Sequence, residues 1–169
     1  ENMIFGKLGI GPKPEKLTAC YLLIANASEA FSGKTTLYQL SFKTVREVPY
    51  QSFMKLTLPL SSGFVFPSNL QCNTYTINSM NLNVAITCTK IDNTIIFTGL
   101  TKNIAKGFDV GLQFYLTNPP YSGYTDEFVF QIFRKDTNYI YDARDDVPAI
   151  LINPAQMINV TLLSNITSI

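Results

Sequence analysis

Hydrophobic and polar residues alternate one by one over long stretches of this 169-residue chain. In the clearest stretch, residues 108–117, the apolar side chains all share one parity: Phe108, Val110, Leu112, Phe114 and Leu116. A period of two places successive side chains on opposite faces of a β-strand, one facing a core and the other facing water. The pattern therefore predicts a half-buried strand over 108–117.

Similar alternation recurs along the chain, with turn-forming residues between the stretches. It predicts further strands over residues 18–25, 36–45, 53–58, 82–88, 94–99, 127–134, 138–142, 149–152 and 157–163. Turn signals separate them, such as Ser-Gly-Lys at 32–34, Asn-Pro-Pro at 118–120 and Asn-Pro at 153–154. No long stretch has a clean helical period. Many short strands joined by turns are typical of a sandwich or barrel, so the sequence predicts an all-β fold.

The first residues of the chain differ from the rest. Glycine and proline interrupt regular structure there, and Gly11-Pro12-Lys13-Pro14 is typical of a short extended linker. We expect residues 1–16 to be a linker or the end of a preceding unit. Residues 17–169 are expected to form a single domain, because either half of a chain split near residues 60–70 would have a thin core.

Composition narrows the classes of function. Charged residues make up 15% of the chain, against roughly 25% in typical soluble domains, and Ser, Thr and Asn fill the polar positions instead. This suits an extracellular β-protein. The net charge is +1 and the basic residues are scattered singly, so the sequence shows no basic patch of the kind that binds nucleic acid. No apolar run approaches the ~20 residues that span a bilayer.

Three cysteines occur, at positions 20, 72 and 88. The segment between Cys72 and Cys88 is long enough for a turn and a strand, so we predict a disulfide between these two, which suits an oxidising compartment. The alternative is that all three are small buried hydrophobic residues. Cys20 is then either a buried thiol or a partner for another chain or segment.

The chain contains no histidine. This excludes Ser-His-Asp and Cys-His nucleophile arrangements and histidine-based metal sites. We therefore predict no catalytic residues and no enzymatic activity.

Two clusters are candidates for binding. Asp142, Asp145 and Asp146 lie together on a predicted loop and could offer oxygen ligands to Ca²⁺, although a solvated turn with a local ion pair to Arg144 is the simpler interpretation. Tyr121 and Tyr124 lie on a proline-rich loop, where they could contact a sugar or a partner protein. Alternatively, the two tyrosine rings pack over the end of the sandwich. No cofactor other than calcium is indicated.

Three Asn-x-Ser/Thr sequons make Asn26, Asn159 and Asn165 candidate glycosylation sites. Their number is close to the chance expectation. Asn159 has the outward parity of its predicted strand, so a glycan is sterically compatible with that position.

The order of several motifs resembles a known type of module. A Tyr38-x-Leu40-x-Phe42 strand precedes a Leu-x-Leu-Pro strand that ends at Pro59. The segment Phe66-Pro67-Ser68-Asn69, the Cys72…Cys88 pair and a Thr-Ile-Ile-Phe strand from Thr94 follow. After them come a long alternating strand that ends at Asn118-Pro119, the start of a strand at Thr125 and a tyrosine-aspartate stretch at 139–142. Over residues 17–165 this is similar to the immunoglobulin-like modules repeated in very large, cysteine-containing surface and secreted proteins of ciliated protists. The resemblance implies an antiparallel β-sandwich in an extracellular multi-module protein. It offers no catalytic residues.

Together these observations predict an immunoglobulin-like antiparallel β-sandwich at the cell surface or outside the cell. The favoured function is a non-enzymatic structural or adhesion module, a repeating unit or subunit of a surface or ciliary filament. Like modules or copies of itself would be its partners, through sheet edges that include Met3–Phe5 and Met157–Leu163. The alternative is a sandwich module that binds carbohydrate or calcium.

Overall fold

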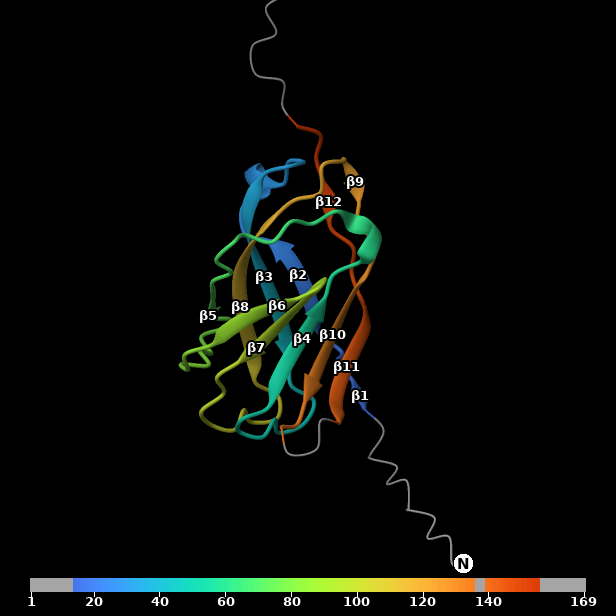
Figure 1. Ribbon diagram of the computed structural model, residues 1–169. Coiled ribbons are helices and arrows are strands. Elements are labelled where there is room, and N and C mark those ends of the chain that lie inside the picture. Colours follow the sequence, from blue (N-terminus) through green and yellow to red (C-terminus); the bar gives the residue numbers. More distant parts are fainter. Residues whose placement is uncertain (1–13, 136–138, 156–169) are drawn as a thin grey trace, which may run out of the picture.

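A computed structural model describes residues 14–135 and 139–155 and shows two β-sheets packed face to face (Figure 1). The first sheet has four strands, in the order β2 (Cys20–Ile24), β3 (Thr35–Lys43), β8 (Asp109–Thr117) and β5 (Cys72–Tyr75). The second has six, in the order β1 (Glu15–Lys16), β11 (Ile140–Val147), β10 (Phe128–Phe133), β4 (Phe53–Thr57), β7 (Thr94–Thr98) and β6 (Thr87–Ile91). A short ribbon of β9 (Gly123–Tyr124) and β12 (Leu151–Ile152) lies at one end. Two 3-10 turns, η1 (Ala27–Glu29) and η2 (Leu60–Ser62), complete the described elements.

The connectivity is that of an immunoglobulin-like sandwich, which confirms the predicted fold class. In their order across the first sheet, β2, β3, β8 and β5 take the places of strands A, B, E and D. In the second sheet, β4, β10 and β11 take those of C, F and G. All pairings except the parallel one between β1 and β11 are antiparallel. The hairpin of β6 and β7 is inserted between strands D and E and widens the second sheet next to β4.

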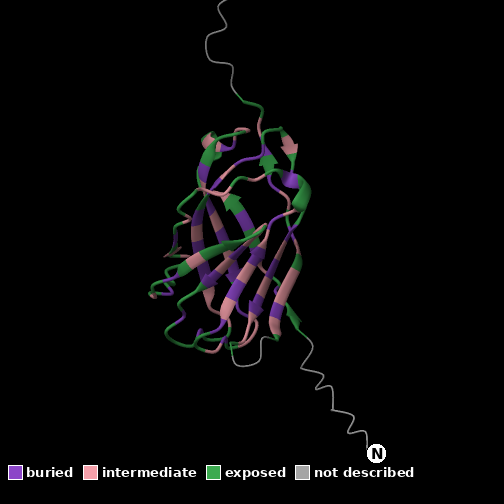
Figure 2. Cartoon of the chain, viewed as in Figure 1, coloured by how far each residue is buried: buried purple, intermediate pink, exposed green. Residues whose placement is uncertain are grey.

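The core lies between the two sheets and is made of the inward parity of each strand, as the alternating colours of the strands in Figure 2 show. On β8 the inward side chains from Val110 to Leu116 are fully buried. They meet buried side chains of the other sheet, and the rings of Phe97 and Phe114 lie 5.6 Å apart between centroids. Phe42 and Phe130 make a second contact across the layers at 4.8 Å. The side chains that alternate with a period of two in the sequence are therefore the ones that form this core.

Two predicted strands differ from the observed ones, and the four-residue strand β5 was not predicted. Residues 82–86 form a loop that pairs with no strand, although Leu82 and Ile86 are buried in the core. The strand β6 begins only at Thr87. As an edge strand, β6 has no fully buried side chain and so no alternation to detect. β5 escaped prediction because Cys72 is its only buried residue. The strand expected over 138–142 continues as β11 to Val147.

Both long edges of the sandwich are closed by links between the sheets. On one edge, the predicted disulfide is confirmed and joins Cys72 of β5 to Cys88 of β6, with Cα atoms 5.9 Å apart. On the other edge, the chain itself crosses from β1 to β2. There Leu17 N–H donates to Ala143 O at 3.1 Å, and Arg144 Nη1 donates to the carbonyls of Leu17 and Thr18.

A buried hydrogen-bond network fixes the end of the sandwich where β8 ends. Tyr38 is fully buried and its hydroxyl donates to Asn118 Oδ1 at 2.5 Å. The Asn118 amide in turn donates to Phe31 O at 2.7 Å. Burial raises the pKa of the Tyr38 hydroxyl well above its ordinary value, so it remains a donor at all physiological pH values. The turn residue Asn118 therefore ties β3 to the loop that follows η1.

Removing the disulfide should lower the free energy of unfolding by about 3 kcal/mol, because a cross-link over a loop of this size restricts the unfolded chain. Urea unfolding with and without reductant measures the loss. The double variant Cys72→Ala/Cys88→Ala is the control, since reductant should change its stability no further. Equal stability of the oxidised and reduced forms would contradict the role given to this link.

Replacing Tyr38 with phenylalanine should cost about 1–3 kcal/mol, because it leaves the buried Asn118 oxygen without its donor. Thermal or urea unfolding measures the change. Tyr124→Phe is the matched control, because Tyr124 is 73% exposed and surface changes of this kind usually stay within about 0.5 kcal/mol.

Candidate functional site

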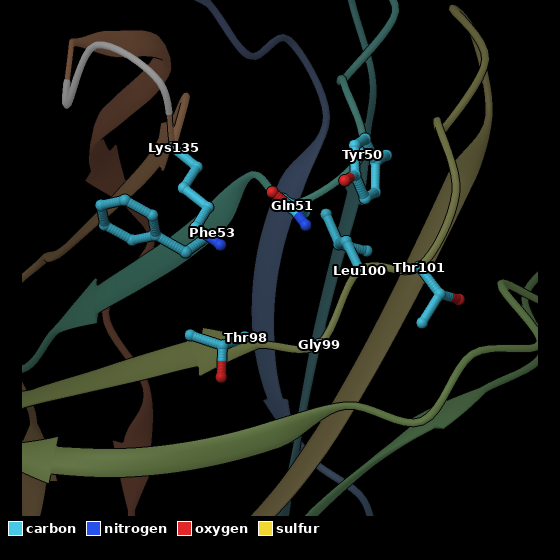
Figure 3. Close-up of a pocket in the computed structure, with 8 residues that line it drawn as sticks. All are labelled: Tyr50, Gln51, Phe53, Thr98, Gly99, Leu100, Thr101 and Lys135. Carbon is cyan, nitrogen blue, oxygen red and sulfur yellow. The ribbon is translucent and has the colours of Figure 1, made fainter.

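A hollow of about 560 Å³ opens at one end of the sandwich, in the region of the loops that join strands B to C and F to G. Its lining comes from the loop before β4 and the first residue of β4, from the last residue of β7 and the segment after it, and from one residue after β10. These residues are Tyr50, Gln51, Phe53, Thr98, Gly99, Leu100, Thr101 and Lys135. Figure 3 shows Phe53 and Lys135 on one side, Tyr50, Leu100 and Thr101 on the other, and Gln51 between them. In immunoglobulin variable domains the B–C and F–G loops carry the binding site.

Backbone hydrogen bonds hold the walls of this hollow. Tyr50 N–H donates to Asn103 Oδ1 at 2.8 Å and Gln51 N–H donates to Leu100 O at 3.0 Å. Gln51 adopts a left-handed conformation with φ of 62°, which non-glycine residues rarely do. At Gly99, φ is +103° and an added Cβ would lie 2.5 Å from Ala85 O, so only glycine fits there. The hollow is therefore a built feature of the loops.

The chemistry of the lining is mixed. The Phe53 ring stacks on Phe133 at 5.0 Å, and the ammonium of Lys55 lies 4.5 Å from the Phe133 centroid. Tyr50 is half exposed. An adjoining hollow of about 440 Å³ adds Ser52, whose buried hydroxyl has no hydrogen-bond partner within residues 14–135 and 139–155. Such a lining suits a small ligand with one apolar face and polar groups at its rim.

The acidic cluster considered for calcium lies on a strand and not on the expected loop, and calcium binding itself stays a prediction. Residues 140–147 form β11. Asp142 is fully buried and accepts a hydrogen bond from Arg46 Nε at 2.8 Å, while Asp146 pairs with Lys16 and with Arg144. Asp145 is exposed. Within the described part of the chain, no group of three or more acidic or cysteine side chains is placed to hold a metal ion.

Two of these carboxyl groups have shifted pKa values of opposite sign. Burial raises the pKa of Asp142, and the hydrogen bond and charge of Arg46 oppose the shift. The hydrogen bond from Lys16 lowers the pKa of Asp146, with a further contribution from Arg144. Both groups lie where β11 meets β1, and their ion pairs help to close this edge.

The remaining predicted residues lie apart from the hollow. Tyr121 and Tyr124 are exposed at the other end of the sandwich, where Tyr124 of β9 pairs with Leu151 of β12. Their contact with a partner stays a prediction. Asn26 is exposed at the start of η1 and accepts a hydrogen bond from Ser28 N–H. Asn159 and Asn165 lie outside the described residues, and glycosylation at all three stays a prediction.

Cys20 is a core residue of β2. It is fully buried, and burial raises the pKa of its thiol to about 12. A protonated, inaccessible thiol of this kind is inert. Of the two roles considered for Cys20, the structure therefore favours the buried thiol.

Comparison with known proteins assigns no family to this chain. No family model matches it, and no curated protein matches it. Solved structures with a similar arrangement include an uncharacterised protein from Nocardia farcinica with an immunoglobulin-like fold (11% identity, 84% of this chain and 88% of that one, TM-score 0.44). A cohesin module of a family 33 glycoside hydrolase from Clostridium perfringens has 13% identity over 80% of this chain and 98% of its own, with a TM-score of 0.45. ChBD2 from Thermococcus kodakarensis has 12% identity over 77% and 99%, with a TM-score of 0.39.

Membrane-spanning helices are absent from the described residues, none of whose helices is long and apolar enough for that purpose. The resemblance to modules of ciliated protists stays a prediction.

The stability of the natural protein relative to an Asp142→Asn variant should fall as pH rises above the ordinary carboxyl pKa of 3.8. In that range the folded protein holds the Asp142 proton more tightly than the unfolded chain does, so folding is penalised as the proton is lost. Urea unfolding of both proteins across the acidic range measures the difference.

Asp146→Asn is the matched control and should show the opposite sign. The lowered pKa of Asp146 means that its contribution is present above the unfolded-state pKa and is lost as pH falls through the folded-state pKa. The same sign for both variants would contradict the assignment of Asp142 as the desolvated carboxyl.

Proposed function

We propose that this chain is a non-enzymatic adhesion or structural module of a secreted or cell-surface protein, joined in line with copies of itself or with similar modules. The observation that carries the proposal is the position of the entry and exit strands. β1, where the described chain enters, and β12, just before it leaves, lie at opposite ends of the sandwich (Figure 1). A module connected in this way extends a polymer by its full length.

Both connecting segments are tied firmly to the sandwich. β1 pairs in parallel with β11, and Lys16 Nζ lies 2.7 Å from Asp146 Oδ2. After β12, Asn153 N–H donates to Ala30 O at 2.6 Å and Ala155 N–H donates to Ser32 Oγ at 3.0 Å. A load applied between neighbouring modules would therefore pass through the paired sheets instead of peeling off a loose end.

Two further properties support an extracellular setting. The disulfide between Cys72 and Cys88 is of a kind that persists in oxidising compartments. The low charge content and the sequon at the exposed Asn26 agree with it. A filament at the cell surface is the assembly that we propose for such modules.

The edges available for pairing with a neighbour are β1 and β6 of the wider sheet and β2 and β5 of the narrower one. Each edge strand presents unpaired backbone groups that another strand can complete. The two segments first proposed for this role, Met3–Phe5 and Met157–Leu163, lie outside the described residues. Their pairing with a neighbour stays part of the proposal.

A protein with two copies joined by the natural end segments should be close to twice as long as one copy, because the connections leave from opposite ends. Small-angle X-ray scattering of the single and tandem proteins measures the maximum dimension. A tandem in which one copy has an added flexible Gly/Ser linker is the control and should give a broader distance distribution. A compact tandem with the two copies side by side would overturn the in-line arrangement.

A further inference from the structure

The outward parity of the four-stranded sheet carries a set of side chains that the core does not use. Strand register places them in rows across the sheet. One row contains Leu23, Gln39, Gln113 and Asn73, and the next contains Tyr21, Ser41, Gly111 and Tyr75. Leu37 and Tyr115 face each other on the far side of the amide row.

Amide groups form the centre of this face. Gln39, Gln113 and Asn73 are direct cross-strand neighbours on three adjacent strands, which lie about 4.8 Å apart. Each amide offers two N–H donors and one carbonyl acceptor. A row of three can therefore bind several hydroxyl groups of one extended ligand, donating to some and accepting from others.

Tyrosine rings flank the amide row on both sides. An added Cβ at Gly111 would lie 2.8 and 2.9 Å from two ring carbons of Tyr75, so the ring lies across the bare backbone of that glycine. Its hydroxyl is hydrogen-bonded to Ser41, the residue on the other side of Gly111. The ring is thus held flat against the sheet. Tyr21 and Tyr115 are each 48% exposed, which leaves their rings available for stacking.

Charge is absent from these rows. The first charged pair is Lys43 and Asp109, which face each other one row further along, and Asn78 Nδ2 donates to Asp109 at 3.0 Å. A shallow hollow of about 170 Å³ lies there and includes Tyr21 and Ser41 in its lining. A neutral surface of rings and amides offers little to a nucleic acid or an acidic peptide, because both need cations.

We propose that the outer face of the four-stranded sheet binds a neutral oligosaccharide. Sugar rings would stack on Tyr75, Tyr115 and Tyr21, since each ring has an apolar face of C–H groups. Their hydroxyls would bond to the amides of Gln39, Gln113 and Asn73. The site lies on a different surface from the hollow lined by Tyr50 and from the exposed tyrosines 121 and 124.

The inference goes beyond the in-line arrangement and does not depend on it. A module can bind sugar whether or not it is joined to others, and the scattering measurement on tandem copies takes no account of this face. The two proposals can therefore fail separately.

The test is to screen the full chain against a panel of neutral oligosaccharides built from hexoses, pentoses and N-acetylated hexosamines, with acidic oligosaccharides as comparators. Calorimetry then measures the affinity for the best ligand. We expect binding to at least one neutral oligosaccharide at millimolar concentration or below. Tyr115→Ala and Gln113→Ala should each weaken it by about tenfold or more.

Two control variants separate this face from the other exposed tyrosines. Tyr139→Ala removes a ring of similar exposure elsewhere, and Tyr124→Ala removes a more exposed one; both should leave the affinity unchanged. Circular dichroism checks that each variant is folded, and the surface positions Tyr115 and Gln113 keep the test independent of Tyr75, whose loss would uncover Gly111.

Three outcomes would overturn the proposal. The first is that no neutral oligosaccharide binds at millimolar concentration. The second is binding that Tyr139→Ala or Tyr124→Ala abolishes while Tyr115→Ala does not. The third is a dimer in light scattering that Tyr115→Ala converts to monomer, which would assign the face to a second copy of the chain.

Discussion

Two sheets of unequal width must stay face to face over one layer of apolar side chains, and the rest of the structure depends on how their edges are held together. The hydrophobic layer supplies the attraction between the sheets, but it is non-directional and allows sliding. Direction comes from the edges. The disulfide between β5 and β6 closes one side, and the crossing of the chain at Leu17, held by Arg144, closes the other. The two ends, the outer faces and the unpaired backbone groups of the edge strands are then the surfaces for contacts with other molecules.

Closing the edge between β11 and β1 buries a charged pair, Arg46 and Asp142. Arg46 reaches Asp142 inside the edge between β11 and β1, and it also donates to Tyr141 O at 3.0 Å and covers the Tyr141 ring at 4.4 Å. Burying a carboxylate is unfavourable unless a partner compensates it, so the pair specifies the alignment of the edge more than it adds stability. Asp142 is paired with Arg46 and Asp146 with Lys16, so two of the three aspartates considered for calcium already have a cationic partner within the chain.

The sequence predicted the sandwich well where burial alternates and poorly where it does not. β3 and β8 bury every second side chain, so the sequence showed their period of two and predicted correctly which side chains face the core. β5 and β6 lie at sheet edges with one buried residue or none, so β5 was not predicted and the strand predicted over 82–88 begins too early for β6. Asp142 to Asp146 are polar residues in a strand, and their polarity suggested a loop because their partners Arg46 and Lys16 are far away in sequence. The hollow around Tyr50 was also not predicted, because its lining comes from three segments far apart in the sequence that no local pattern connects.

The same reasoning explains why the outer face of the four-stranded sheet could not be read in advance. Alternation separates inward from outward side chains within one strand, but it says nothing about which outward side chains become neighbours. Register supplies that information, and it is set by long-range pairing. Once β3, β8 and β5 are aligned, three amides scattered over 75 positions of sequence, from Gln39 to Gln113, form a single row. Gly111 then has a clear role, because a side chain there would displace the Tyr75 ring from the sheet. A glycine in the middle of a long strand weakens that strand, and here the close approach of Tyr75 requires it: a Cβ at Gly111 would lie 2.6 Å from the backbone oxygen of Tyr75 and 2.8 Å from its nearest ring carbon.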